Sequence, residues 1–262
     1  MSDMRIPITV CHGANDHLTV ERFSQLVGIA SELGFTAINY DQLYHWLVEA
    51  GDLPEKPIVF DFDHPVLSTY ESFFPILKEH GFVGNLFVNT GCLEEQSDEV
   101  YATWRQISEL KNAGWTIGAH THTHPNLSVL LAEDSTGENL RLEMTKNNQI
   151  IQSNLGFEPE YFAFTGAANG ITWSDVAEKQ ARNHYKLGRL WILDSRCEVN
   201  GSVARYAEFM GSTEADEVDG GPPNYLRYIT RQTPRFKLPA MELEGLIFEP
   251  DAFQRYLIGS LK

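Results

Sequence analysis

Short apolar runs alternate with longer amphipathic stretches along most of the chain. The runs are rich in branched and aromatic residues, as β-strands are, whereas the longer stretches repeat apolar residues at helical spacing. The expected strands are residues 6–10, 36–39, 58–62, 85–88, 115–119, 161–164 and 187–193. The expected helices are residues 18–33, 41–49, 68–80, 97–113, 138–155 and 174–183. Gly34 and Gly81 follow two of these helices and predict where they end.

This regular alternation predicts an α/β protein. About seven strand–helix units succeed one another with no linker rich in Pro, Gly or Ser, so one domain spanning residues 1–262 is expected. The strands should form a parallel sheet covered by helices, either closed as a barrel or open. In both forms the ligand site lies at the C-terminal ends of the strands. The acidic stretch 214–219 and the Gly and Pro residues at 220–223 predict an exposed loop.

Composition and charge exclude several classes of protein. Of the 262 residues, 42% are hydrophobic and 21% are charged, and no apolar run approaches the roughly 20 residues that cross a bilayer. The net charge of −16 argues against nucleic acid or an anionic membrane surface as a partner. Cys11, Cys92 and Cys197 form no CxxC pair and fit a reducing compartment. As it stands, the sequence predicts a cytoplasmic protein, or a secreted one if a leader peptide had been removed.

Three histidines in five residues follow the apolar strand at 115–119. The segment HTHTHP runs from His120 to Pro125 and includes His122 and His124. On a helical turn His120 and His124 would share a face while His122 points elsewhere, whereas on an extended strand all three would share a face. Imidazoles at this spacing suit zinc, iron, cobalt or nickel. The segment therefore indicates a metal site at a strand end, with an exposed polar loop as the alternative.

A second polar segment, DFDHP from Asp61 to Pro65, ends the strand at 58–62. Asp61 and Asp63 should point to one side of an extended strand, with His64 opposite unless the chain turns. Pro65 restricts His64 to extended conformations and favours a turn here. Hydrolytic metal chemistry needs a carboxylate beside the ligands, because three protein ligands leave a position for water and the carboxylate takes its proton. Alone the segment is weak evidence, since an Asp at a strand end commonly forms a turn or caps a helix.

Together the two segments resemble the polysaccharide deacetylase family, also called carbohydrate esterase family four. The HTHTHP segment at 120–125 is a close match to its second motif, a histidine, three residues and a histidine–proline pair. Residues 53–59 (LPEKPIV) resemble the approach to its first motif, and residues 70–77 (YESFFPIL) fall where the family has similar residues. The likeness runs from about Ile8 to at least Gly188. It implies a (β/α) barrel, distorted or incomplete, with about seven strands.

The first motif departs from the family pattern of threonine, phenylalanine, two aspartates and glycine. Aligning Phe62 with the motif phenylalanine places Asp63 at the first aspartate, by resemblance the catalytic base. His64 then falls on the second aspartate, by resemblance the third metal ligand, so that His64, His120 and His124 would hold the metal. Three neutral imidazoles would leave the metal a stronger Lewis acid and favour zinc over magnesium. A one-residue shift, with Asp63 as ligand and no base, is the competing alignment.

The later motifs are altered. Residues 161–166 (YFAFTG) resemble the third motif without its proline–tyrosine pair, and no leucine–histidine pair occurs late in the chain, because the last histidine is His184. The family's usual general acid is therefore missing. His122, His12 or water could replace it, and either histidine could instead contact the substrate. Residues 236–239 resemble the closing segment of some members.

The resemblance implies a metal-dependent hydrolase that removes an acyl group, usually N-acetyl, from a sugar or polysaccharide. A divalent metal, zinc foremost, would bind water and the carbonyl oxygen; Asp63 would take the proton of the water, and a proton donor would assist the departing amine. Two alternatives stay open. One is a hydrolase of a non-carbohydrate amide, such as a ureide, imide or formamide, on the same fold. The other is a catalytically weak relative that binds sugar without turning it over.

Overall fold

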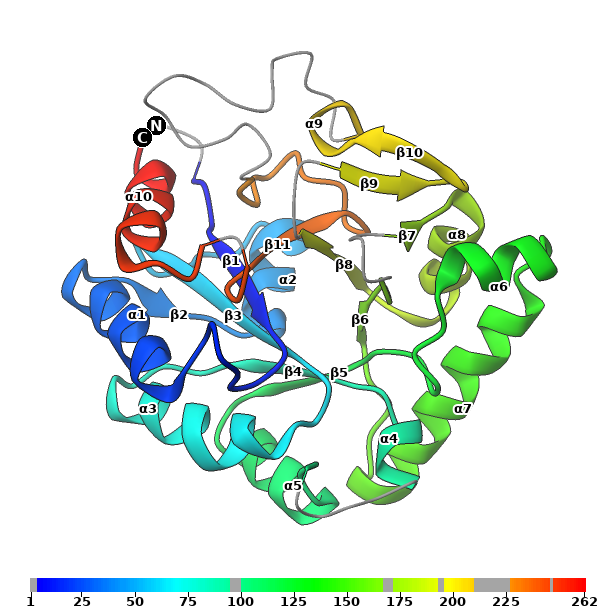
Figure 1. The fold of residues 1–262 in the computed structure, drawn as a ribbon, viewed down its shortest axis with the longest axis horizontal. Helices are drawn as coiled ribbons and strands as arrows, with labels where there is room; N and C mark the ends of the chain where they lie inside the picture. The colour runs from blue at the N-terminus through cyan, green and yellow to red at the C-terminus, as the bar shows by residue number, and fades with distance from the viewer. Residues whose placement is uncertain (1–3, 95–99, 167–171, 193–195, 210–226, 246) are drawn as a thin grey trace.

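The centre of the molecule is a ring of parallel strands. The computed structural model describes residues 4–94, 100–166, 172–192, 196–209, 227–245 and 247–262. The strands of the ring are β1 (Ile8–Cys11), β3 (Pro57–Asp63), β4 (Asn85–Val88), β5 (Thr116–Ala119), β6 (Tyr161–Ala163), β8 (Leu187–Ile192) and β11 (Leu238–Glu242). Hydrogen bonds join them in the order β1-β11-β8-β6-β5-β4-β3, and β1 also pairs with β3, which closes the ring (Figure 1). The predicted α/β barrel with about seven strands is confirmed.

The membership of the ring differs from the prediction at two strands. The predicted strand 36–39 is β2 (Thr36–Ala37), which pairs with Pro57 and Ile58, the first two residues of β3. From Val59 onward the same edge of β3 pairs with β1. The place of that strand in the ring is taken by β11, which lies between β1 and β8. Pro239 lies inside β11 and hides its strand character in the sequence.

Helices surround the ring, and one of them closes an end of it. They are α1 (Val20–Glu32), α2 (Tyr40–Glu49), α3 (Phe74–Glu79), α4 (Gly91–Glu94), α5 (Trp104–Asn112), α6 (Leu127–Glu133), α7 (Glu138–Leu155), α8 (Asp175–His184), α9 (Tyr206–Phe209) and α10 (Pro250–Ser260) (Figure 1). From α2, the side chains of Tyr40, Leu43 and Trp46 join the apolar cluster inside the ring. A second apolar cluster fills the space between the ring and the outer helices. None of the helices in the described ranges is long and apolar enough to cross a membrane.

Two predicted helices differ in extent from those observed. The helix expected at 68–80 is a π-helical turn, η1 (Thr69–Phe73), followed by α3, and Pro75 stands in the first turn of α3, where its missing N–H costs nothing. The helix expected at 97–113 is α5, which begins only after Thr103. Thr103 caps α5 in a reciprocal pair with Gln106, a signal for the helix start that the periodicity obscured. Residues 97–99 and the acidic loop 214–223 lie outside the described ranges.

A small second sheet was not predicted. It consists of β7 (Thr172–Trp173), β9 (Arg196–Val199) and β10 (Ser202–Arg205), and it lies beside α8 at one side of the ring (Figure 1). Its strands are too short and too polar to produce a clear alternation in the sequence. The ring strands, by contrast, are almost wholly buried, and their C-terminal ends carry the polar residues that build the site.

Candidate active site

His64, His120 and His124 converge at the C-terminal ends of β3 and β5. Each offers a ring nitrogen, and the three nitrogens lie within 4.8 Å of one another, a spacing that fits a shared metal ion. Their ring centroids are 4.8–5.2 Å apart. His64 and His124 are partly exposed and His120 is buried. The structure thus brings together the three residues that the sequence predicted as ligands.

The two loops reach this arrangement through left-handed backbone turns. The φ angles of His64, Thr121 and His124 are 64°, 61° and 56°, which non-glycine residues rarely adopt and which cost about 1–3 kcal/mol each. The turn expected at His64 is therefore present, but the extended conformation expected of His64 before Pro65 is wrong. The turn in the second loop directs His120 and His124 to one side. Neither the helical nor the extended geometry considered for that loop is present.

Hydrogen bonds prepare two of the imidazoles for a metal. Nδ1 of His64 lies 2.8 Å from Oδ1 of Asn89, and Nδ1 of His120 lies 2.9 Å from the carbonyl oxygen of Ala163. Both partners are acceptors, so each Nδ1 carries the hydrogen and each Nε2 keeps a free lone pair. Nε2 of His120 is buried, and no side chain or backbone group of the described ranges bonds to it. An orphaned nitrogen aimed at two other imidazoles fits a divalent metal.

Burial keeps these histidines neutral. It lowers the pKa of His64, lowers that of His120 well below its usual value, and lowers that of His124 to about 4. Neutral imidazole is the form that binds a metal. Burial thus favours, in all three histidines, the protonation state that a metal requires.

Asp63 lies beside the cluster and is paired with a buried arginine. Its Oδ2 lies 3.8 Å from Nε2 of His120, and its Oδ1 accepts a hydrogen bond from Nη2 of Arg189, a fully buried residue of β8. Burial alone would raise the pKa of Asp63, but the Arg189 guanidinium outweighs burial and holds that pKa well below its usual range. Asp63 is therefore a carboxylate at neutral pH, as a general base must be.

Asp61 completes the buried group around Arg189. Its Oδ2 accepts a hydrogen bond of 2.7 Å from the hydroxyl of Tyr40 and lies 3.4 Å from Nε of Arg189. Burial raises the pKa of Asp61 to about 7, in spite of the guanidinium nearby. One arginine thus faces two carboxylates of β3, which lie on a common side as predicted. It stabilises the charge on Asp63, whereas Asp61 is more readily protonated.

His12, at the end of β1, faces Asp63 across the site. Its Nε2 lies 3.9 Å from Oδ2 of Asp63, and its Nδ1 lies 3.1 Å from Oε2 of Glu244. Burial works against protonation of His12, yet the hydrogen bond to Glu244 and the nearby carboxylates raise its pKa. A second carboxylate, that of Glu242, lies 3.9 Å from Nδ1 of His12 and accepts a hydrogen bond from Nε1 of Trp191.

His12, Glu242 and Glu244 also lie close enough together to hold a cation. Hydrogen bonds already occupy both carboxylate oxygens of Glu244, however, since the backbone N–H and the ring of His12 donate to them. The arrangement is better suited to keeping His12 protonated than to binding a metal.

His122 points away from the cluster. Its Nδ1 lies 2.9 Å from the hydroxyl of Thr90, and its Nε2 lies 3.5 Å from Oε2 of Glu94. It is absent from the described residues that line the cavity at the site. Of the two histidines suggested as proton donor or substrate contact, the structure places only His12 at the cavity.

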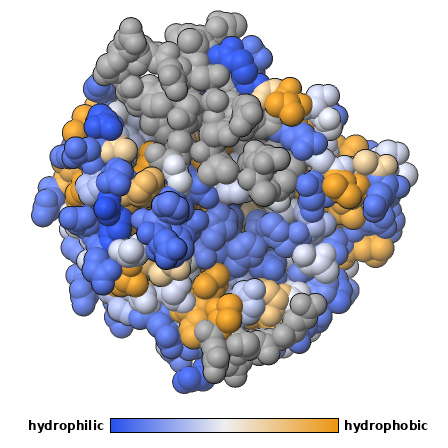
Figure 2. Space-filling view, viewed as in Figure 1, coloured by the Kyte–Doolittle hydropathy of each residue, from blue (hydrophilic) through white to orange (hydrophobic). Residues whose placement is uncertain are grey.

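The cavity at the site has a volume of about 290 Å³. Its lining consists of His12, Asp63, His64, His120, His124, Phe164, Gly166 and Trp191. Polar groups that can bind, deprotonate and protonate thus share one small space with two aromatic side chains. In the view of Figure 2 hydrophilic residues gather at the middle of the face.

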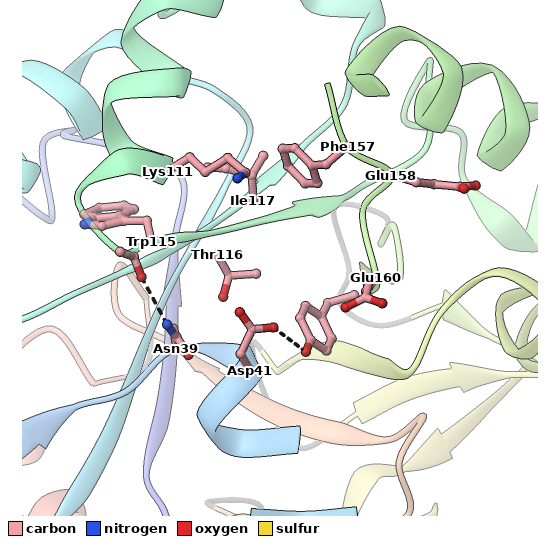
Figure 3. A pocket seen from close by; sticks show the side chains of 11 residues that line it. Asn39, Asp41, Lys111, Trp115, Thr116, Ile117, Phe157, Glu158 and Glu160 are labelled. Atoms are coloured by element: carbon pink, nitrogen blue, oxygen red, sulfur yellow. Dashed lines mark hydrogen bonds between the residues drawn. The ribbon is translucent and has the colours of Figure 1, made fainter. Parts of the chain in front are cut away.

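A larger cavity, of about 370 Å³, lies at the opposite end of the ring, where β5 and β6 begin. Asp41, Lys111, Glu158 and Glu160 contribute charged groups to it (Figure 3). The Asp41 carboxylate accepts a hydrogen bond from the hydroxyl of Tyr161. Neither of the possible metal-binding groups of the described residues lies there. The smaller cavity is therefore the candidate active site.

Several residues of the site were not predicted from the sequence. Arg189 was assigned to a strand without a role, although a charge within the apolar run LGRLWI is a signal of a buried ion pair. Asn89, Glu242 and Glu244 carry no local signal, since their partners lie far away in the sequence.

The fold and the site define a (β/α) barrel with a cluster of histidines and carboxylates at the C-terminal ends of its strands. The chain belongs to the polysaccharide deacetylase family, because the family model described as polysaccharide deacetylase matches residues 50–185, more than half of the chain. The matched segment contains Asp63 and the three-histidine cluster, whereas His12 and Arg189 lie outside it. Membership of this family indicates an enzyme that removes acyl groups from sugars by hydrolysis of an amide or ester bond.

Solved structures share the fold at low sequence identity. The Streptococcus pyogenes deacetylase PplD, in complex with acetate, has a TM-score of 0.70 and 18% identity, with 100% of both chains covered. IcaB from Ammonifex degensii has a TM-score of 0.71 and 16% identity, covering 99% of this chain and 98% of that one. BC0361, a polysaccharide deacetylase from Bacillus cereus, has a TM-score of 0.66 and 13% identity, covering 97% and 69%. No curated protein sequence matches the chain.

Proposed function

We propose that this protein is a metal-dependent deacetylase that removes N-acetyl groups from a sugar or polysaccharide. The observation that carries the proposal is the meeting of three neutral imidazoles with a charged carboxylate, Asp63, in one cavity. A divalent metal held by His64, His120 and His124 would supply a Lewis acid that polarises a carbonyl group and lowers the pKa of water. An all-nitrogen ligand set favours zinc over magnesium.

Asp63 is the proposed general base. It lies next to the ligands without being needed as one, and Arg189 keeps it charged, so it can accept a proton from the attacking water. Two observations favour the alignment in which His64 is a ligand over the shifted one. One oxygen of Asp63 is already paired with Arg189, and the hydrogen bond from Nδ1 of His64 leaves its Nε2 free for the metal.

His12 is the proposed proton donor for the departing amine. It faces Asp63 across the cavity, and the Glu244 carboxylate, hydrogen-bonded to its Nδ1, favours the imidazolium. Glu242, whose pKa burial raises to about 7, adds to this effect in its ionised form. An imidazolium positioned opposite a carboxylate base provides the two proton transfers that amide hydrolysis requires. Phe164 and Trp191 complete the cavity with apolar surface beside these groups.

The test combines metal content with acetate release. We expect elemental analysis to find one transition metal per chain, reduced in His120→Ala and His64→Ala and retained in Asp63→Asn. With N-acetylglucosamine oligosaccharides as substrate, Asp63→Asn should release acetate about 10²–10⁴-fold more slowly, the usual loss for a general base. Full activity of Asp63→Asn would show that the base lies elsewhere.

Other outcomes decide among the alternatives. Metal loss in His120→Ala but not in His64→Ala would favour the shifted alignment. If the protein binds metal and hydrolyses a formamide or a cyclic imide but none of the oligosaccharides, its substrate is a non-carbohydrate amide. A protein that takes up no metal under any reconstitution would be a non-catalytic relative.

A further inference from the structure

His64 depends on a hydrogen bond that a carboxylate ligand in its place would not need. A neutral imidazole has one N–H, and the partner of one ring nitrogen decides whether the other can bind a metal. Asn89 follows directly after β4, and its Oδ1 lies 2.8 Å from Nδ1 of His64. Because an amide oxygen only accepts, the hydrogen stays on Nδ1 and the lone pair of Nε2 is free for the metal.

The end of β4 holds Asn89 and His64 in this relation. The backbone N–H of His64 donates to the carbonyl oxygen of Phe87, 3.1 Å away, so the chain that carries the imidazole is fixed to β4. Asn89 is only 6% exposed, and its own carbonyl oxygen accepts a contact of 3.0 Å from Sγ of Cys92. Backbone and side chain of the same short segment therefore set both the position of His64 and its tautomer.

The tautomer of His120 is fixed by a hydrogen bond to the backbone, which substitution of a side chain does not remove. The acceptor for its Nδ1 is the backbone carbonyl of Ala163, which every residue type would supply. His64 is different because its acceptor is a side chain. Of the two ligands with a fixed tautomer, only His64 depends on the identity of a neighbouring residue.

We propose that Asn89 is a positioning residue that selects the metal-binding tautomer of His64, so that His64 and Asn89 together replace one carboxylate ligand. The inference rests on the proposed metal site but concerns the supporting residue. A ligand that is a carboxylate has no tautomer to select. The need for Asn89 should therefore exist only while residue 64 is histidine.

The first measurement is metal affinity of the metal-free protein, by competition for Zn²⁺ with a chromophoric chelator and by the visible absorption of bound Co²⁺. Asn89→Ala should bind about 10–100-fold more weakly, the usual loss when a supporting hydrogen bond to a ligand is removed. Asn89→Asp, which keeps an acceptor, should bind at least as tightly as the wild type. Asn154→Ala is the control, because Asn154 is exposed on α7 and its side chain donates to the carbonyl oxygen of Ile150 in the same helix.

The second measurement is a double-mutant cycle with His64→Asp. In that background Asn89→Ala should change the affinity by no more than about twofold, which is the scatter expected for uncoupled sites. An equal loss in both backgrounds would mean that Asn89 acts only on the fold, and no loss in either would mean that it does not act on the metal; both overturn the proposal. Urea unfolding of each metal-free variant separates loss of affinity from loss of folding.

The outcomes also separate this inference from the proposed function. A wild type that binds Zn²⁺ while the cycle shows no coupling keeps the proposed function and overturns the role of Asn89. A wild type that binds no metal overturns both. If His64→Asp binds no metal, the comparison of Asn89→Asp with Asn89→Ala decides, and equal weakening of the two overturns the tautomer argument.

Discussion

Two histidines of the cavity have opposite electrostatic surroundings although they lie close together. The ring centroids of His12 and His64 are 5.7 Å apart. His12 donates to Glu244 and has Glu242 nearby, which favours the charged ring, whereas His64 donates to a neutral amide and is kept neutral by burial. The partner of each Nδ1, rather than the distance between the rings, thus distinguishes the proposed proton donor from the proposed metal ligand.

The role of His12 can be tested through the leaving group. An amide needs a proton on its departing nitrogen, whereas p-nitrophenolate departs without one, so a lost general acid should matter only for the amide. We expect His12→Asn to slow acetate release from N-acetylglucosamine oligosaccharides about 10²–10⁴-fold and to change hydrolysis of p-nitrophenyl acetate little.

The matched control for His12 is His122→Asn, which removes a histidine that points to Thr90 and lies outside the cavity. It should leave the ratio of the two activities unchanged. An equal loss on both substrates in His12→Asn would assign His12 to substrate binding or to the fold instead of to proton transfer.

The sequence predicted site residues that lie within one short motif and missed those whose partners lie far away along the chain. The HTHTHP and DFDHP segments contain the proposed ligands and the proposed base, because the motif residues stand next to one another. Arg189 meets Asp63 only because β8 and β3 face each other across the ring, 126 positions apart in the chain. Glu244 lies 232 positions from His12. No spacing in the sequence encodes such pairs.

At the scale of elements, α7 fixes the loops that carry the site. Glu143 accepts hydrogen bonds from the backbone N–H groups of His122 and Thr123 and from the Thr123 hydroxyl. One helical turn later, Asn147 donates to the carbonyl oxygen of Val88 and accepts from the N–H of Thr90. The same helix face therefore ties down the loops after β5 and after β4, which hold His124 and Asn89.

Removal of the Glu143 contacts should loosen the histidine loop. We expect Glu143→Ala to lower the free energy of unfolding by about 1–3 kcal/mol, the cost of losing hydrogen bonds to a charged group. It should also weaken Zn²⁺ binding about tenfold, because His124 would have to be ordered when the metal binds. Urea titration and chelator competition measure the two effects.

Gln149→Ala, an exposed change on the same helix, is the control for Glu143→Ala and should alter neither quantity. Loss of stability without loss of metal affinity would limit Glu143 to a structural role. Unchanged stability would show that the hydrogen bonds to Glu143 contribute nothing to the fold.

The elements themselves were predicted where hydrophobic periodicity is strong. The predicted bounds of α7 and of β4 are the observed ones, since each has a clear pattern and a clear end. β11 was missed because Pro239 interrupts it, and α10 was also not predicted. Ring closure is a property of the strand order. It could be expected only from the resemblance to a family, because alternation of strands and helices fits an open sheet equally well.

At the scale of the whole molecule, charges buried inside the ring couple folding to pH. Burial raises the pKa of Asp61 to about 7 from its usual 3.8, so between about pH 4 and pH 7 the folded chain holds a proton that the unfolded chain has released. Stability from this group therefore falls as the pH rises through that range and stays low above it. The histidines of the cluster act in the opposite direction, because their lowered pKa values favour the folded chain as the pH rises.

A difference measurement isolates Asp61 from the histidines. Asp61→Asn keeps an oxygen that can accept from the Tyr40 hydroxyl but carries no charge. The free energy of unfolding of the variant, relative to that of the wild type, should therefore rise between pH 4 and pH 7 and stay constant above pH 7. The rise should be at most about 1.4 kcal/mol per pH unit. Urea unfolding of metal-free protein across this range gives the difference. Asp41→Asn, which removes another carboxylate that accepts from a tyrosine hydroxyl, that of Tyr161, is measured beside it as the control for loss of such a hydrogen bond. A constant difference for Asp61→Asn would mean that Arg189 keeps both carboxylates of β3 charged, and the site would then contain one negative charge more than the chemistry proposed here assumes.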